Sequence, residues 1–155
     1  LDAWVQSISG CLRQGLILLI DYGYSRHEYY HQQRAQGTLL CHYRHRVHSN
    51  PFIFVGLQDI TASVDFTAVA EAAVASKLSV SGFTTQAYFL FASGLDRIMQ
   101  EQKDLSNVEQ LELSRQIKTL TLPGEMGERF KVIALTRKLN SSLSGFSLVD
   151  HRRRL

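Results

Sequence analysis

Two carboxylates stand out as groups that could take part in acid–base chemistry. Asp21 follows an apolar run, Leu16 to Ile20, and Gly23 just beyond it permits a tight turn. An acidic residue at the carboxyl end of a buried parallel strand lies where open α/β sheets form their ligand crevice. A purely structural role for Asp21, capping the following turn, stays open. Asp59 lies too early to cap the helix expected after Asp65, so its carboxylate is free to line a site.

Other polar side chains could belong to the same site. Thr61 accompanies Asp59 and is likewise too early to cap the helix that follows. His42, Arg44 and Arg46 alternate along an expected strand and would form a polar strip on one face. This strip could meet an anion or another subunit, and it could equally be a solvated face.

The segment from His27 to His31 matches the H-E-x-x-H motif, in which a helix places two histidines on one face for zinc and the glutamate activates water. Such motifs lie in long helices with a buried face. The flanks here are polar, with little apolar periodicity, and the segment begins soon after an apolar strand. We therefore expect a solvated loop or a short helix. A zinc hydrolase that uses His27, Glu28 and His31 is kept as an alternative.

The elements that would position these residues follow from hydrophobic periodicity. The run Leu16 to Ile20 is apolar on both faces, which is typical of a fully buried parallel strand. Asp65 can cap a helix of strong helical periodicity, and Thr84 or Thr85 can cap another that Gly94 ends. The remaining expected elements are helices over Trp4 to Leu12 and Asp104 to Leu120, and strands over Thr38 to Val47, Leu78 to Phe83, Phe130 to Leu135 and Phe146 to Val149.

Helices alternate with strands along the chain, which predicts an α/β layer architecture in a single domain. In the helix expected from Asp104, the residues Val108, Leu111 and Ile117 have the spacing of an inward face. No stretch of the sequence has the composition of an interdomain linker.

Composition excludes several classes of protein. The chain has 155 residues, of which 45% are hydrophobic and 20% charged, so disorder is excluded as its main state. Its longest unbroken aliphatic run is far too short to cross a bilayer. Two cysteines cannot form a disulfide scaffold and fit a reducing compartment. The net charge of +3 is too mild to indicate a dedicated nucleic-acid binder.

Several longer segments distinguish this sequence from a generic α/β protein. The segments IDYGY (20–24), HEYYHQQRAQGTLLCHYRHRVH (27–48), QDITASVDF (58–66), GFTTQAYFL (82–90), PGEMGERFKVIAL (123–135) and GFSLVDHRRRL (145–155) follow one another in this order. With these segments the chain resembles the MidA-like family of class I S-adenosylmethionine-dependent methyltransferases, which includes bacterial members and mitochondrial complex I assembly factors.

The resemblance implies a Rossmann-like methyltransferase sheet with added helices. It also implies that residues 1–155 are the C-terminal portion of a longer enzyme. The family's glycine-rich cofactor loop and its acidic ribose-binding residue belong to an N-terminal half that this sequence lacks. We therefore expect no cofactor-binding residue in this chain, and we expect the chain alone to be inactive and to bind S-adenosylmethionine weakly or not at all.

Members of the family with an assigned substrate methylate an arginine on a respiratory complex I subunit, which implies a protein arginine as the acceptor here. A guanidinium needs carboxylates that hold its planar fork and take up a proton as the new bond forms. Asp21 and Asp59 are the expected catalytic carboxylates, with Tyr22 as a hydrogen-bonding neighbour. Thr61, Arg44 and His42 are the expected substrate-binding residues.

The same resemblance leads us to expect a protein substrate as the partner, no nucleic acid and no membrane, with a homodimer left open. It implies a cytoplasmic enzyme, or one of the mitochondrial matrix if the source is eukaryotic. A non-catalytic domain that docks a protein partner remains the main alternative, and a glycine-rich loop after a strand in the upstream reading frame would argue against it.

Overall fold

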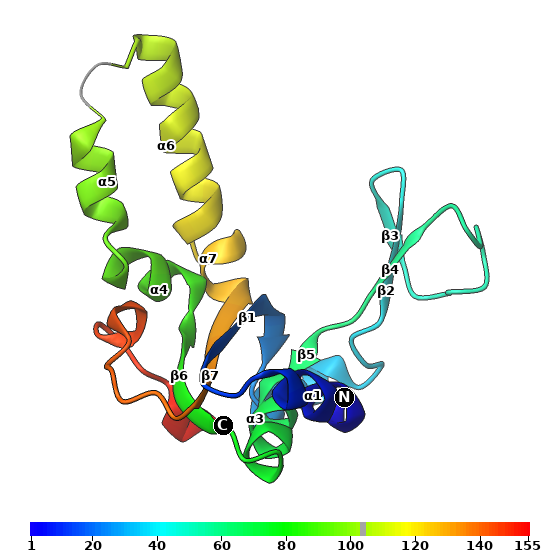
Figure 1. Ribbon diagram of the computed structural model, residues 1–155. Helices are drawn as coiled ribbons and strands as arrows, with labels where there is room; N and C mark the ends of the chain where they lie inside the picture. Colours follow the sequence, from blue (N-terminus) through cyan, green and yellow to red (C-terminus); the bar gives the residue numbers. More distant parts are fainter. Residues whose placement is uncertain (103–104) are drawn as a thin grey trace.

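A mixed four-stranded sheet forms the centre of the computed structural model, which describes residues 1–102 and 105–155 (Figure 1). Its strands are β1 (Gly15–Tyr24), β5 (Val64–Asp65), β6 (Ser79–Thr85) and β7 (Phe130–Arg137), in the order β5-β1-β7-β6. β7 is antiparallel to both β1 and β6, whereas β5 is parallel to β1. β1 and β6 therefore run in the same direction and end at the same edge of the sheet.

Helices and 3₁₀ turns complete the chain. They are α1 (Asp2–Cys11), α2 (Arg26–Tyr29), α3 (Phe66–Ala75), α4 (Gln86–Ala92), α5 (Leu95–Glu101), α6 (Asn107–Thr121), α7 (Met126–Arg129), η1 (Gln32–Arg34), η2 (Ser144–Phe146) and η3 (Arg152–Arg154). A separate three-stranded sheet, in the order β3-β2-β4, consists of β2 (Leu40–Tyr43), β3 (Arg46–His48) and β4 (Asp59–Thr61). We call this projecting sheet, with the loop that joins β3 to β4, the β-arm (Figure 1).

The main core lies between the sheet and the helices α1 and α3. Phe66 and Val69 of α3 pack there with Val5 of α1 and with Ile133 and Leu135 of β7. The side chain of Asp65 begins α3, since it accepts a hydrogen bond of 3.0 Å from the amide of Ala68, and Thr85 caps α4 in the same way. Both caps are confirmed.

On the opposite face of the sheet, the described helices and turns cover β6 and β7 but not β1. There Val132 and Ala134 pack against Phe146 of η2, with Phe89 of α4 beside them. Gly82 lies directly under the Phe146 ring, where a Cβ would come within 2.3 Å of its Cγ atom. This contact explains why the sequence has glycine inside β6.

Leu16 to Ile20 is a strand, as predicted, but the prediction of a parallel strand buried on both faces is wrong. Over this stretch β1 pairs antiparallel with β7. Its exposure alternates, with Leu16 40%, Leu18 37% and Ile20 48% exposed. The reason is that α1 and α3 cover one face of β1, while α4 and η2 reach only β6 and β7 on the other.

Three further predictions are wrong. The expected strand Thr38 to Val47 is a hairpin, because Arg44 and His45 form its turn with φ values of 46° and 63°. The segment Phe146 to Val149 is not a strand, since it follows directly from the turn η2. α6 is a helix as expected, but Val108 and Leu111 are 76% and 72% exposed and do not face inward. Asp104, where this helix was expected to begin, lies outside the described residues.

Within residues 1–102 and 105–155 there is no helix with both the length and the apolar character needed to cross a membrane.

Candidate functional site

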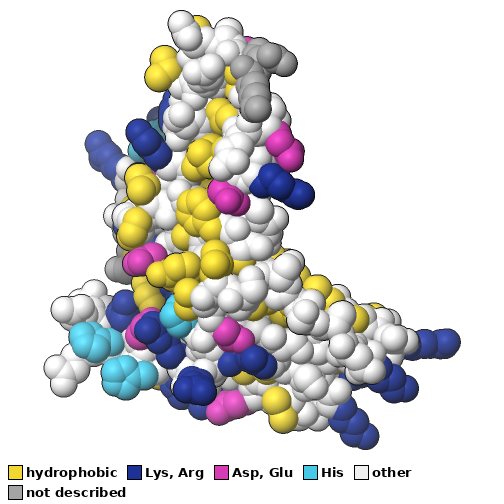
Figure 2. Space-filling view, turned by 90° about the vertical axis from the view of Figure 1, so that its left-hand side faces the viewer, with side chains coloured by type: hydrophobic (Ala, Val, Ile, Leu, Met, Phe, Trp, Pro, Cys, Tyr) yellow, Lys and Arg dark blue, Asp and Glu magenta, His cyan; other side chains and the backbone are white. Residues whose placement is uncertain are grey.

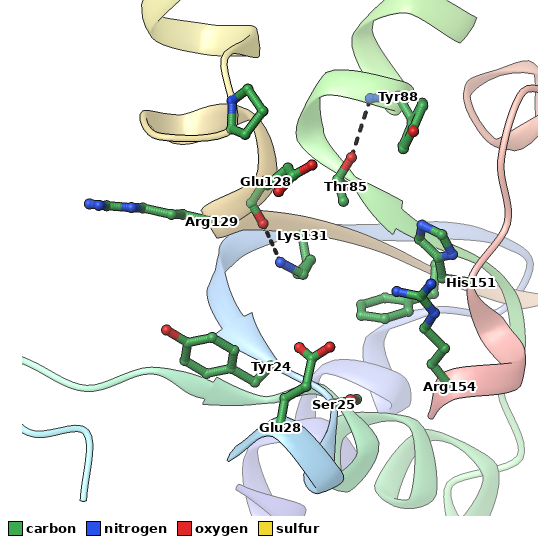
Figure 3. A pocket seen from close by; sticks show the side chains of 12 residues that line it. Tyr24, Ser25, Glu28, Thr85, Tyr88, Glu128, Arg129, Lys131, His151 and Arg154 are labelled. Carbon is green, nitrogen blue, oxygen red and sulfur yellow. Dashed lines mark hydrogen bonds between the residues drawn. The ribbon is translucent and has the colours of Figure 1, made fainter. Parts of the chain in front are cut away.

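A solvent-connected pocket of about 440 Å³ lies where β1 and β6 end and β7 begins. This is the edge at which open α/β sheets bind their ligands. Its walls come from β1, α2, β6, α4, α7, β7 and the C-terminal segment (Figure 3). The residues that line it are Tyr24, Ser25, Glu28, Phe83, Thr85, Tyr88, Pro123, Glu128, Arg129, Lys131, His151 and Arg154.

Glu28 brings a carboxylate into this pocket from α2 (Figure 3). The short helix is held in place by Arg26, whose amide donates to Thr67 and whose guanidinium pairs with Glu71 of α3 at 2.5 Å. The hydrogen bond from Arg26 lowers the pKa of Glu71 and, in turn, Glu71 raises that of Arg26. With α2 tied to α3 on one side, Glu28 is left to face the pocket.

Tyr24 forms an aromatic wall next to Glu28. The guanidinium carbon of Arg34 lies 3.9 Å from the centroid of the Tyr24 ring, a cation–π contact. The same guanidinium donates to the carbonyl of Glu28 at 2.5 Å. Arg34 therefore fixes the aromatic ring relative to the helix that carries the carboxylate.

Lys131 enters the pocket from the beginning of β7. Its amine donates to the carbonyl oxygen of Glu128 in α7 (Figure 3). Burial lowers the pKa of Lys131, an effect that the charges of Glu28 and Glu128 oppose and that of Arg154 reinforces. The lysine is thus a cation held partly out of water.

His151 and Arg154 form the opposite wall, and the segment that carries them is fixed against β6. The amide of His151 donates to the carbonyl of Phe83 at 2.6 Å. Asp150 accepts hydrogen bonds from the amides of Phe83 and Arg152 at 3.4 and 3.0 Å, and Arg152 pairs with it at 2.7 Å. Burial lowers the pKa of His151, with a further contribution from Arg154, so the imidazole is mainly neutral at pH 7.

The predicted catalytic residues do not meet in this pocket. β1 continues to Tyr24, so Asp21 lies within the strand and accepts a hydrogen bond from the amide of Tyr22. Asp21 lines a second cavity of about 400 Å³, together with Trp4 and Ile20. The Tyr22 ring packs edge-on against Phe130. Tyr24, rather than Asp21, lies at the end of the strand.

The other predicted residues lie in the β-arm. Asp59 and His42 are opposite one another in β4 and β2, and the Thr61 hydroxyl lies 3.4 Å from Nε2 of His42. Arg44 is not on the same strand face as His42, because it lies in the hairpin turn. The structure thus brings Asp59, Thr61 and His42 together, but on a different sheet from Asp21.

The H-E-x-x-H segment does not have the geometry of a zinc helix. α2 ends at Tyr29, and His31 is an extended residue whose Nδ1 accepts from the amide of Gln33. The two histidines therefore do not share one helix face. No cluster of three His, Cys, Asp or Glu residues suited to a metal ion occurs in the described part of the chain.

The sequence predicted no functional role for Tyr24, Tyr88, Lys131 or His151, and it indicated Glu28 only as part of a zinc motif. The sequence signal that could have identified these residues was indirect. Each lies in or beside a segment that carried the family resemblance, such as GFTTQAYFL or GFSLVDHRRRL, but no spacing connects residues so far apart in the chain.

The fold and the site define the class of this protein: it is an α/β protein with a pocket at the edge of the sheet where β1 and β6 end. Residues 1–84 match the sequence model of a family described as "Putative S-adenosyl-L-methionine-dependent methyltransferase". The match spans more than half of the 155 residues, and the chain belongs to this family.

Solved structures agree with this assignment. A COG1565 superfamily member from Burkholderia thailandensis, bound to S-adenosyl-homocysteine, matches with a TM-score of 0.94 and 43% identity, over 99% of this chain and 40% of its own. A native structure from the same organism matches with the same TM-score and identity, over 99% of this chain and 41% of its own. No curated protein matches the chain. The chain thus spans about two fifths of the length of these structures.

The predicted fold class and the predicted cofactor of the family, S-adenosylmethionine, are confirmed by these matches. The strand-to-helix turns after β1 and β6 present the side chains of Tyr24, Ser25 and Thr85 and contain no run of glycines. They therefore differ from a dinucleotide-type cofactor loop, in which glycines allow the backbone to lie close to the bound cofactor.

Proposed function

We propose that this chain forms the acceptor-binding part of an S-adenosylmethionine-dependent methyltransferase whose substrate is an arginine of another protein. The observation that carries the proposal is the Glu28 carboxylate, which faces a pocket with aromatic walls at the carboxyl edge of the sheet. A carboxylate binds a guanidinium through paired, charge-assisted hydrogen bonds. The rings of Tyr24 and Tyr88 offer faces for its weakly hydrated plane.

The cofactor supplies an electrophilic methyl group on a sulfonium. The residues of this chain bind and orient the acceptor, and the pocket reduces its contact with water. Lys131 and Arg154 also line the pocket, and their positive charge opposes the binding of a further cation, an effect that the carboxylates of Glu28 and Glu128 offset. Because the same charge disfavours the protonated acceptor, it helps the guanidinium to lose a proton during transfer.

The family resemblance supports a MidA-like enzyme that acts on a respiratory complex I subunit, in the cytoplasm or the mitochondrial matrix. These finer assignments, and a homodimeric state, are part of the proposal. The roles of Asp21, Asp59 and Tyr22 in catalysis and of Thr61, Arg44 and His42 in substrate binding also remain proposals, and Glu28 is added as the pocket carboxylate that we expect to bind the acceptor.

A peptide methylation assay with the full-length protein tests the proposal. Arginine-containing peptides from complex I subunits are incubated with S-adenosylmethionine carrying a labelled methyl group, beside peptides in which lysine replaces the arginine. We expect label only on the arginine peptides, and a loss of about 100-fold in kcat/KM for Glu28→Gln, the order of a lost charge-assisted contact.

The matched control is Glu101→Gln, which removes an exposed carboxylate on α5 that pairs with Arg97 at 3.9 Å and does not line the pocket. It should leave turnover unchanged. Label on the lysine peptides, or a Glu28→Gln variant as active as the control, would contradict the proposal.

The β-arm supports the docking of a protein. Phe52, Val55 and Leu57, in the loop between β3 and β4, are 86%, 74% and 68% exposed. Exposed apolar side chains grouped in this way are typical of interaction sites. They suit a protein substrate, and they also keep the non-catalytic docking domain as a second candidate, for which the wild-type protein would bind its partner but transfer no methyl group.

A further inference from the structure

The C-terminal segment is built into the pocket wall rather than left as a solvated basic tail. Asp150 accepts three hydrogen bonds, two from Arg152 within the segment and one from the amide of Phe83 in β6, and a fourth hydrogen bond joins the amide of His151 to the carbonyl of Phe83. Arg152 also donates to the carbonyl of Val80. These contacts determine where the imidazole of His151 lies, on the side of the pocket opposite Tyr24 (Figure 3).

The imidazole of His151 faces charged and polar groups from several elements. Glu28 approaches from α2, Lys131 from β7, Arg154 and Asp150 from the C-terminal segment, and Tyr88 packs edge-on from α4 with ring centroids 6.2 Å apart. Among the hydrogen bonds of the described residues, none involves either nitrogen of this ring. A ring nitrogen therefore remains available to a group bound between Glu28 and His151.

We infer that the imidazole of His151 accepts the proton that the acceptor guanidinium releases when it is methylated. This inference rests on the proposed function. Both residues line the pocket, and His151 lies on the side opposite Tyr24. In the inferred arrangement Glu28 holds the fork of the guanidinium, and His151 takes up the proton of the nitrogen that reacts. The lowered pKa of His151 keeps the ring unprotonated at neutral pH, which is the form that can accept a proton.

The proton and charge balance closes with these groups alone. The nitrogen of the guanidinium forms the bond to the methyl carbon, and the carbon–sulfur bond breaks with its electron pair left on sulfur. The sulfonium becomes a neutral thioether, the N–H proton moves to His151, and the methylated guanidinium keeps its single positive charge. The imidazolium then loses its proton to solvent through the mouth of the pocket.

The test uses the full-length protein and the arginine peptide that it methylates. The variant His151→Gln keeps a polar side chain of similar reach but cannot accept a proton, and we expect it to lower kcat by about 100-fold with little change in KM. In the wild type, kcat should fall on the acid side of a pKa below the usual 6.5 of histidine, and this fall should be absent in the variant. The control His27→Gln changes an exposed histidine outside the pocket.

A second measurement does not depend on turnover or on the folding of a variant. The imidazole signals of His151 in the wild type, followed by NMR, should shift on addition of ethylguanidinium and not of ethylammonium. If the wild type is active and His151→Gln keeps both its kcat and the fall of kcat at acid pH, the role of His151 is overturned while the proposed function stands. The same conclusion follows if the imidazole signals do not shift on addition of ethylguanidinium. A wild type that methylates no arginine overturns the proposed function, and the role of His151 with it.

Discussion

Arg137 connects three segments of the main core, and its replacement by methionine should destabilise the protein measurably. Its guanidinium lies at the end of β7 and donates to three backbone carbonyls: Ser9 at 2.9 Å, Leu12 at 2.8 Å and Ser76 at 2.7 Å. The first two belong to the end of α1 and the third follows α3. A cation at helix C-terminal carbonyls is favoured by the helix dipole as well.

Hydrogen bonds to a charged group contribute about 1.5–3 kcal/mol each, so three fully buried ones would contribute about 4.5 kcal/mol or more. Arg137 is only partly buried, and water can replace it at the more exposed carbonyls. We therefore expect Arg137→Met, which keeps the apolar stem, to lower the free energy of unfolding by about 2–3 kcal/mol. Arg137→Lys can reach fewer carbonyls at once and should recover about half of that loss.

Urea unfolding of the full-length protein measures the loss, and hydrogen exchange of the segment 2–12 shows whether it is local. The matched control is Arg13→Met, an exposed arginine between α1 and β1. If Arg137→Met loses no more stability than Arg13→Met, and exchange in α1 is unchanged, the carbonyl contacts contribute nothing and the reasoning is refuted.

Four further predictions concern the cavity beside Asp21, the histidine motif, the second face of the sheet and the cofactor. If the exposed carboxylate of Asp21 acts from the second cavity, Asp21→Asn in the full-length enzyme should lower turnover far more than stability, and unchanged turnover would remove Asp21 from the mechanism. Metal analysis of the purified protein should find no stoichiometric zinc, and His27→Ala should leave the circular dichroism spectrum intact; one bound equivalent that depends on His27 would refute this. Gly82→Ala should cost about 1–3 kcal/mol because its Cβ would collide with the Phe146 ring, and an unchanged unfolding midpoint would contradict that contact. The isolated 155-residue chain should bind S-adenosylmethionine weakly or not at all in titration calorimetry, because none of its described strand-to-helix turns is glycine-rich, and saturable micromolar binding would show that this assignment is wrong.

The sequence predicted helix starts and strands well where the stabilising contact joins residues that are close in the sequence. Asp65 caps α3 through a residue three positions away, and Thr85 caps α4 likewise. Phe130 to Leu135 is a strand, and Val132 to Leu135 are fully buried because β7 has a strand on each side and packed side chains on both faces.

Leu16 to Ile20 shows why the rest could not be predicted. Its apolar pattern is as strong as that of β7, yet every second residue is exposed. Periodicity reports which faces a segment can bury, but not which neighbours cover them in a given chain. The turn at Arg44 and His45 was missed for a different reason, since neither arginine nor histidine is among the residues that dominate tight turns.

The candidate site lies beyond sequence reasoning because its members share no spacing. Glu28 is placed by Arg26 and Arg34, and His151 by Asp150, so the two parts of the site, each with the residues that position it, come from opposite ends of the chain. The direction of β1 and β6 brings these ends to one edge of the sheet, and β7, running the opposite way, adds Lys131 from its first residues. The chemistry of this pocket therefore depends on the strand order, and a change that loosens the C-terminal segment from β6 should impair the site without touching any group that lines it.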